Sequence, residues 1–421
     1  MTVDFGGFEH VNSAGTYLDS AFTLQGGASI VTTSPPTGSR CMEVNFNSAA
    51  ISGTELNNAN TLKMRPLVPI YWGLCINPQT TTPGATHNVL EFRVSGAVKR
   101  ELSINASREL LWANGSNTQI GPTIAALATA TNHWFMGETM PWGTRPYDRI
   151  WKWNGTGWDT VVDVVYAPVT DAAATPYRDA DCTAWGDSTA LLGMWVGNTS
   201  KAAAVDVIRY DDPWVEVPRN AVTVQEFHAV RPAYLRVARM LPNGDGATVQ
   251  WTIDTAGGTH ASRLDDVPVG DIVSTATDPR DQVDTSGSDK TDLYDLEAMP
   301  AGKQPVALKM MVGGREGGAA NAIEGTLVSG SDSDLQSLIG VITGSTGTGV
   351  ALGSNAKVLE HPPNASADKW TETLVNAVQA KIHTVSGNTE EMKVGGVCAE
   401  VLYEDNAATP AIRCEPLVAA W

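Results

Sequence analysis

The chain alternates apolar and polar residues in short runs along nearly its whole length. Clear examples lie at 41–46, 89–94 and 205–210. Because successive side chains of a strand point to opposite faces, runs of this kind predict strands that bury one face. Clusters of Gly, Asn, Pro and Thr separate the runs and predict turns. We therefore expect an all-β protein.

Within this pattern, the segment 151–158 predicts a β-hairpin, because Asn154 and Gly155 form the strongest local turn signal of the chain. The Gly-rich segment 313–318 also indicates a hairpin turn. Helical periodicity is scarce. The best candidates for short helices are the segments 333–342 and 368–380.

A break in the pattern falls near residues 213–224. Pro213 and Pro218 end one alternating run, and a new run begins at 222–224. A chain of 421 residues is long enough for two domains with cores of their own. We predict a first domain at 1–216 and a second at 222–421, each a β-sandwich, in tandem.

The second half carries four segments that resemble a known family when read in order. They are an Asp-Asp-x-Pro turn within 263–268, an Asp-x-Tyr-x-Leu segment within 291–296, the alternating strand 305–312 and a Pro…Trp-Thr turn within 361–371. They resemble the carboxy-terminal half of a family of tailed-bacteriophage virion proteins. The resemblance implies a structural or adhesive part of a virus particle.

The first half has a resemblance of its own. It rests on the segments 5–9, 17–19, 40–44 and 205–212. These are similar to a concanavalin-like (laminin-G-like) jelly roll. That resemblance implies that the first and last strands of the domain lie side by side.

The charge of the chain bears on its partners. The formal net charge is −18 and the pI is about 4.7, so phosphate backbones and anionic headgroups repel the protein at long range. We expect no nucleic-acid partner. The acidic segment 265–297 is interpreted as a solvated loop or strand edge, and cation binding there is left open.

The start of the chain lacks the basic region of a signal peptide, and no apolar run approaches the length of a membrane span. We expect no membrane insertion. The expected location is the virion, after synthesis in the host cytoplasm.

Motifs for cofactor or metal chemistry are not found. The five cysteines are scattered, which is typical of reduced, buried thiols, although Cys398 and Cys414 could face each other across strands. The seven histidines show no zinc-ligand spacing. A Gly-Asp-Ser tripeptide at 186–188 is similar to the nucleophile block of lipase-like hydrolases. Those enzymes also need an Asp-x-x-His block to supply the base, and the chain has none, so the tripeptide is interpreted as a turn. We expect no metal and no cofactor.

Glycoside cleavage needs two carboxyl groups close together. Candidates are Glu91, Glu101, Glu138 and Asp148, but the sequence does not show that any pair converges. The Glu-x-Asp-x-x-Glu strand motif of jelly-roll glucanases is absent. The sequence therefore favours a protein that is not an enzyme, with no catalytic residue assigned.

The chain has 13 tryptophans. Seven of them gather in the first domain: Trp134, Trp142, Trp151, Trp153, Trp158, Trp185 and Trp195. Trp151 and Trp153 share one strand face, and Trp158 pairs with them across the predicted hairpin. This trio is predicted either to bind a glycan by stacking or to fill a core or subunit interface.

Together these features predict a non-enzymatic structural protein of a tailed-phage virion. It would be exposed on the particle, as a tail, fibre, spike or capsid-surface component, and would form a symmetric homo-oligomer. The expected partners are other virion proteins, copies of itself and a host-surface glycan during host attachment. The alternatives are a lectin-like adhesin that binds carbohydrate and a glycan depolymerase.

Overall fold

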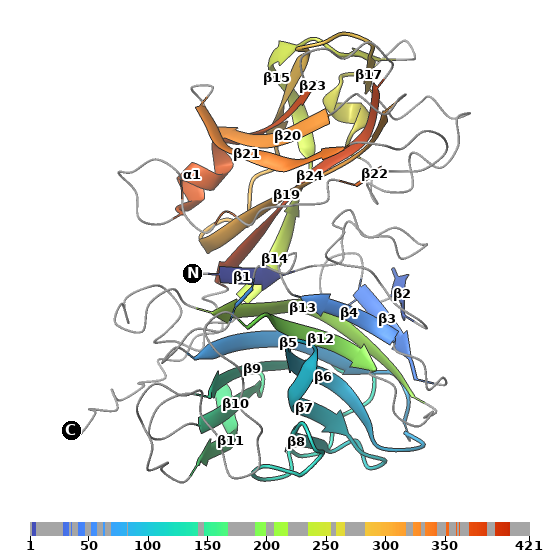
Figure 1. Cartoon of the computed structure of the whole chain (residues 1–421), viewed down its shortest axis with the longest axis vertical. Helices are drawn as coiled ribbons and strands as arrows, with labels where there is room; N and C mark the ends of the chain where they lie inside the picture. The colour runs from blue at the N-terminus through green and yellow to red at the C-terminus, as the bar shows by residue number, and fades with distance from the viewer. Residues whose placement is uncertain are drawn as a thin grey trace, which may run out of the picture.

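A computed structural model describes residues 2–5, 28–32, 35, 41–46, 52–56, 62–63, 69–81, 83–141, 147–166, 190–198, 206–217, 235–253, 258–265, 283–316, 323–329, 333–342, 351–352, 359, 362, 370–384 and 392–404. Almost every regular element in these ranges is a β-strand. The all-β sandwich fold predicted from the alternating pattern is confirmed (Figure 1).

Strands from the first half of the chain form two facing sheets, here called the amino-terminal sandwich. Its larger sheet, with eight described strands, has the order β11-β10-β9-β5-β13-β3-β2, and β1 also pairs with β13. These strands are β1 (Thr2–Phe5), β2 (Ala28–Val31), β3 (Cys41–Asn45), β5 (Ile70–Pro78), β9 (His133–Met140), β10 (Tyr147–Trp153), β11 (Trp158–Val165) and β13 (Val207–Val217). The five-stranded sheet opposite contains, in order, β4 (Ser52–Leu56), β12 (Leu192–Asn198), β6 (His87–Val94), β7 (Ala97–Ile104) and β8 (Leu110–Asn114).

Aromatic side chains fill the core between these two sheets. The indoles of Trp72 and Trp112 stack with centroids 5.8 Å apart, and the ring of Phe92 lies 5.8 Å from that of Trp72. The first and last strands of the sandwich pair along β1 and β13, with Phe5 opposite Trp214. This pairing is the one that the jelly-roll resemblance implied.

Strands from the second half form the carboxy-terminal sandwich. One sheet has the order β16-β17-β24-β19-β22, with β14 also paired to β24. Its strands are β14 (Leu235–Met240), β16 (Thr252–Ile253), β17 (Val283–Thr285), β19 (Gln304–Glu316), β22 (Ala351–Leu352) and β24 (Met392–Glu404). The other sheet contains, in order, β15 (Pro242–Val249), β18 (Thr291–Leu296), β23 (Val378–Thr384), β20 (Ile323–Ser329) and β21 (Ser333–Ile342).

Two short helices accompany these strands, η1 (Ala261–Arg263) and α1 (Glu372–Asn376). The prediction of a helix over 333–342 is wrong, because that segment is strand β21 and pairs along β20. In the segment 368–380, α1 forms one short helix and β23 follows directly. The predicted turn at 313–318 is also misplaced, since Gly313 and Gly314 lie within β19 and pair with β24. Of the segment 213–224, where the domain boundary was predicted, residues 213–217 are the end of β13, so Pro213 does not end that strand, and residues 218–224 lie outside the described residues.

A buried carboxylate organises one end of the carboxy-terminal sandwich. Asp292 on β18 accepts hydrogen bonds from the Tyr294 hydroxyl at 2.9 Å and the Trp251 backbone N–H at 2.9 Å. It also accepts a hydrogen bond from the Gln250 backbone N–H at 2.5 Å, and His260 Nδ1 lies 2.6 Å from Asp292 Oδ2. These bonds hold the segment that contains η1 against the sheet, so His260 has a structural role.

The two sandwiches meet through a third hydrophobic cluster, here called the junction. From the amino-terminal sandwich it includes Phe5, Met136, Trp151, Trp158 and Trp214, and from the other Leu235, Val306, Ala307 and Leu402. Figure 1 shows the sandwiches stacked along the long axis, with β1, β13 and β14 where they meet. At this contact Asp212 accepts a hydrogen bond from the Val237 backbone N–H at 3.4 Å, and Arg236 lies 3.8 Å from the Asp212 carboxylate.

Candidate functional site

Strand β10 presents a stripe of four side chains on the outer face of the larger sheet. Asp148 and Ile150 are fully buried on its inner side. Because side chains alternate along a strand, the residues between and beyond them point outward. They are Tyr147, Arg149, Trp151 and Trp153, of which only Trp151 is buried. The partly exposed members of this stripe are a phenol, a guanidinium and an indole.

The neighbouring strands add carboxylates to this face. In the register of the sheet, Arg149 lies opposite Glu138 on β9 and opposite Asp163 on β11. Arg149 Nε donates to Asp163 Oδ1 at 3.0 Å, and the guanidinium lies 4.7 Å from the centre of the Tyr147 ring. Arg149 is therefore held between an aromatic ring and a carboxylate that is itself 53% exposed.

Glu138 accepts hydrogen bonds from two tyrosine hydroxyl groups. Tyr71 donates to Glu138 Oε1 at 3.3 Å, and Tyr147 donates to the same oxygen. Burial raises the pKa of Glu138, and the bonds from the two tyrosines and the charge of Arg149 offset only part of this effect. A carboxyl group in such a setting is protonated over a wider pH range than an exposed one, and when protonated it can donate as well as accept a hydrogen bond.

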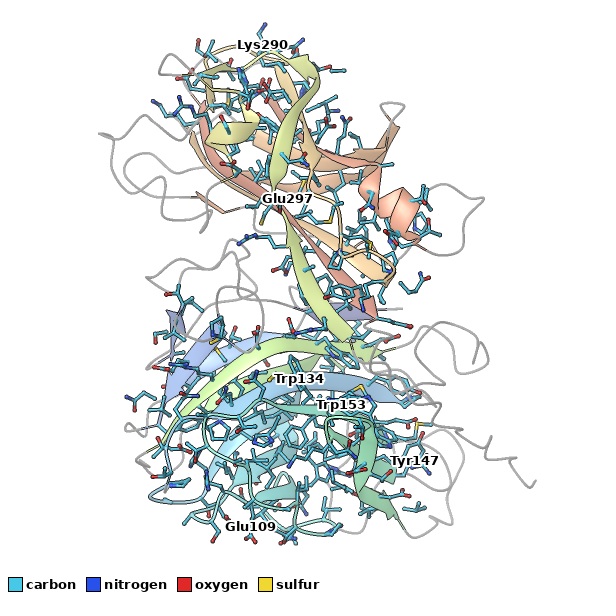
Figure 2. The ribbon with its side chains drawn as sticks, turned by 180° about the vertical axis from the view of Figure 1, so that it is seen from behind. Glu109, Trp134, Tyr147, Trp153, Lys290 and Glu297 are labelled. Carbon is cyan, nitrogen blue, oxygen red and sulfur yellow. The ribbon has the colours of Figure 1, made fainter. Side chains whose placement is uncertain are left out.

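The three tryptophans predicted from the sequence as binding or interface residues lie together at one end of the same face. Trp151 and Trp158 are only 8% and 7% exposed and belong to the junction. Trp153 packs against Trp158 with ring centroids 5.5 Å apart and remains partly exposed. Figure 2 shows Trp153 near the second sandwich and Tyr147 further from it. Of the trio, Trp153 has the ring surface that a ligand can reach.

Other candidates from the sequence are placed elsewhere. Asp148 lies inside the sandwich, where it accepts a hydrogen bond from Arg100 Nε at 2.7 Å. Glu91 and Glu101 lie on β6 and β7 of the five-stranded sheet. Trp142, Trp185 and the tripeptide at 186–188 lie outside the described residues. The sequence reasoning missed Tyr71, Arg149 and Asp163, although the spacing of two between Tyr147, Arg149 and Trp151 was a signal for one face.

Among the described residues, no group of three or more His, Cys, Asp or Glu side chains is arranged to hold a metal ion. Cys41, Cys75 and Cys398 are buried, and Cys414 is outside the described ranges. No helix in the described part of the chain is long and apolar enough to cross a membrane.

No protein-family model and no curated protein sequence matches the chain. Several solved structures resemble it in fold. An endo-β-1,4-glucuronan lyase from the fungus Trichoderma reesei has 11% identity and a TM-score of 0.33, and the match covers 52% of this chain and 95% of that one. A carbohydrate esterase from the Shiga toxin-encoding bacteriophage phi24B has 14% identity and a TM-score of 0.29, over 51% and 99% of the two chains.

A third similar structure spans both sandwiches. The tandem CBM22 domains of Xyn10C from Paenibacillus barcinonensis match 94% of this chain and 96% of their own, with 11% identity and a TM-score of 0.24. At this identity and TM-score the likeness assigns no ligand or reaction. The identity of the chain as a phage virion protein is not shown by these structures.

The comparisons correct one prediction. The sequence favoured a protein that is not an enzyme, but the structures that resemble this chain include two polysaccharide lyases, a glycoside hydrolase of family 131 and an esterase. The prediction treated a jelly roll without a familiar motif as a non-enzyme, and that step is wrong. A fold does not determine a function, so activity must be argued from side chains.

Proposed function

We propose that the protein binds a glycan on the outer face of β9, β10 and β11. The observation that carries this proposal is the stripe of partly exposed Tyr147, Arg149 and Trp153 along β10, with Glu138 and Asp163 on the strands beside it. Sugar sites combine aromatic surface with a few fixed polar groups, and this face supplies both on rigid strands.

The polar groups are already fixed in place before a ligand arrives. Asp163 and Arg149 hold each other at 3.0 Å, and Glu138 is held by its tyrosine donors. Carboxylate and guanidinium groups in fixed positions can bond to neighbouring hydroxyl groups of one sugar ring. Since little side-chain entropy is lost on binding, such preorganisation favours affinity.

The charge of the molecule favours an uncharged ligand. The net charge of −18 repels polyanionic glycans at long range, and this face has two carboxylates for one guanidinium among the groups just named. We therefore expect a neutral glycan.

Binding can be tested by isothermal titration of the full chain with neutral oligosaccharides such as xylo-, gluco- and galacto-oligosaccharides. We expect Trp153→Ala and Asp163→Asn each to weaken binding about tenfold or more, which corresponds to roughly 1.4 kcal/mol. Asp159→Asn is the matched control, because Asp159 lies on the same strand but pairs with Lys152. Unchanged affinity in both site variants would contradict the proposal.

The placement of the protein on a virus particle remains a prediction from the sequence resemblance, as do its homo-oligomeric state and its virion partners. Glycan binding by an exposed sandwich is compatible with a role in host attachment. Mass spectrometry of purified particles would locate the protein, and its absence from them would leave a free carbohydrate-binding protein.

A further inference from the structure

An exposed surface continues the stripe of β10 onto β11, the strand at one end of the described sheet. Three residues of β11 lie opposite the stripe in the register of the two strands: Val165, Asp163 and Thr160. All three are exposed. Asp163 and Thr160 are three residues apart, yet both lie on the outer face, because the register shifts between them. The stripe and these three residues are here called the β10–β11 path.

The path has apolar surface at both ends. At one end Val165 is the cross-strand partner of Tyr147 and is 53% exposed, the highest value for a large apolar side chain among the described residues. Such partners lie side by side, so the valine extends the apolar surface of the phenol ring. At the other end lies the indole of Trp153, which packs against Trp158 and is partly exposed. Both ends therefore offer a surface on which a sugar ring can stack.

Polar groups lie between these two ends. Arg149 and Asp163 are hydrogen-bonded there at 3.0 Å, and Thr160 follows at the next outward pair in the direction of Trp153. The guanidinium and the carboxylate side chains are 26% and 53% exposed, so both are within reach of a ligand. A ligand that contacts the two apolar ends passes over donors and acceptors that match the hydroxyl groups of a sugar chain.

The separation of the ends sets the length of the ligand. Tyr147 and Trp153 are the first and last of the seven residues of β10. A strand rises roughly 3.3 Å per residue, so their Cα atoms lie roughly 20 Å apart. A disaccharide is too short to contact both ends, whereas a longer oligosaccharide in an extended conformation reaches from one to the other. Because outward side chains of a strand form a line, an extended β-1,4-linked chain can follow them, and a helical α-1,4-linked chain curves away.

The junction sets the direction of such a ligand. On the β9 side of the stripe, Met136 is the partner of Trp151, and both are buried because the carboxy-terminal sandwich covers this part of the face. Figure 2 shows Trp153 near that sandwich and Tyr147 further from it. A sugar chain that crossed β9 at Trp151 would meet the second sandwich. A ligand that contacts both ends therefore runs along the strands, over β10 and β11.

We propose that the β10–β11 path binds several consecutive sugars of an extended, neutral, β-1,4-linked glycan that lies parallel to the two strands. This inference rests on the proposed glycan-binding function of the same face and names the class of its ligand. Trp153 and Tyr147 stack on sugars at the two ends of the bound stretch. Arg149 and Asp163 bond to hydroxyl groups of the sugars between them.

The test is isothermal titration of the full chain with xylo- and cello-oligosaccharides, from the disaccharide to the hexasaccharide, and with maltohexaose. We expect the hexasaccharide of at least one β-1,4-linked series to bind about tenfold or more tightly than its disaccharide, because only the longer ligand contacts both ends. Maltohexaose should bind more weakly than that hexasaccharide.

Two variants remove the contacts at the end of the path far from Trp153. Tyr147→Ala and Val165→Ser should each weaken binding of the hexasaccharide by about threefold or more, and weaken binding of the disaccharide less. Val165 is exposed, so its substitution leaves the core intact and keeps the test valid if Tyr147→Ala does not fold. Val249→Ser is the matched control, because Val249 is 42% exposed but lies on β15 of the other sandwich. It should bind every oligosaccharide as the natural protein does.

The outcomes separate this inference from the proposed function. Equal affinity for the disaccharide and the hexasaccharide, tightest binding of maltohexaose, or binding of galacto-oligosaccharides alone would overturn the extended ligand and leave glycan binding in place. Unchanged binding of the hexasaccharide in folded Tyr147→Ala and in Val165→Ser would do the same. If no neutral oligosaccharide binds, the proposed function fails and this inference fails with it.

Discussion

At the scale of single residues, burial and hydrogen bonding shift the pKa of Glu138 in opposite directions. Its carboxyl group is largely removed from water, and two phenol hydroxyls donate to one of its oxygens. Burial is the larger effect, so the pKa rises above its ordinary value of 4.5. The folded protein therefore binds this proton more tightly than the unfolded chain does.

The pH dependence of stability follows from that shift. As the pH rises above 4.5, the unfolded chain loses the Glu138 proton first, so this group lowers the free energy of unfolding until the pH passes its folded-state pKa. In Glu138→Gln the amide oxygen still accepts the tyrosine bonds and cannot ionise. In urea unfolding, we expect the variant to gain stability relative to the natural protein as the pH rises above 4.5. A relative loss over this range would contradict the effect of burial.

Among the elements, the hairpin of β10 and β11 places the stripe and depends on a local turn. Asn154 Oδ1 accepts hydrogen bonds from the backbone N–H groups of Thr156 and Gly157, and the Asn154 N–H donates to the Gly157 carbonyl. Gly155 has a φ of +99°, which side chains disfavour, and a Cβ there would contact nothing within 4 Å. The turn therefore needs glycine for backbone reasons alone.

We expect Gly155→Ala to lower the free energy of unfolding by about 1–2 kcal/mol, because the cost comes only from the backbone conformation. Gly244→Ala is the control, since a Cβ at Gly244 would make ordinary contacts with Asp295 and its φ is not in the positive region. Chemical denaturation of both variants gives the two changes in the free energy of unfolding that are to be compared. An equal effect at the two positions would show that the φ of Gly155 is not what matters.

At the scale of the whole molecule, the junction couples the two sandwiches through side chains from both. Leu402 on β24 is fully buried in it, while the adjacent Val401 points into the core of the carboxy-terminal sandwich. Two adjacent residues of one strand thus pack in two places, Leu402 in the junction and Val401 in the core of one sandwich. Substituting each in turn separates the contribution of the junction from the stability of the carboxy-terminal sandwich.

Truncating Leu402 to alanine leaves a cavity that costs about 2–5 kcal/mol. Because the cavity lies between the sandwiches, we expect Leu402→Ala to lower the unfolding temperatures of both and to separate their transitions in calorimetry. Val401→Ala should destabilise only the carboxy-terminal sandwich. If the two variants have the same calorimetric profile, the junction does not couple the sandwiches.

The sequence by itself determined the strands and much of the local structure. Period-two alternation over 41–46 and 89–94 indicates burial of one strand face, and Asn154-Gly155 favours a turn because both residues tolerate positive φ. These signals are local, so they could be interpreted without the fold. The segment 333–342 was misjudged because its apolar spacing also fits a helix, and only pairing with β20 selects the strand.

Tertiary structure decided which side chains meet. Glu91 and Glu101 were both candidates in the sequence, yet only the register of β6 with β7 places them opposite each other, and no sequence signal predicts that the Asn88 side chain donates to both. The same holds for Glu138 and Asp163, which Arg149 brings to one face, and for Trp151, which the second sandwich covers. Register and packing join residues far apart in the chain, and no local pattern contains that information.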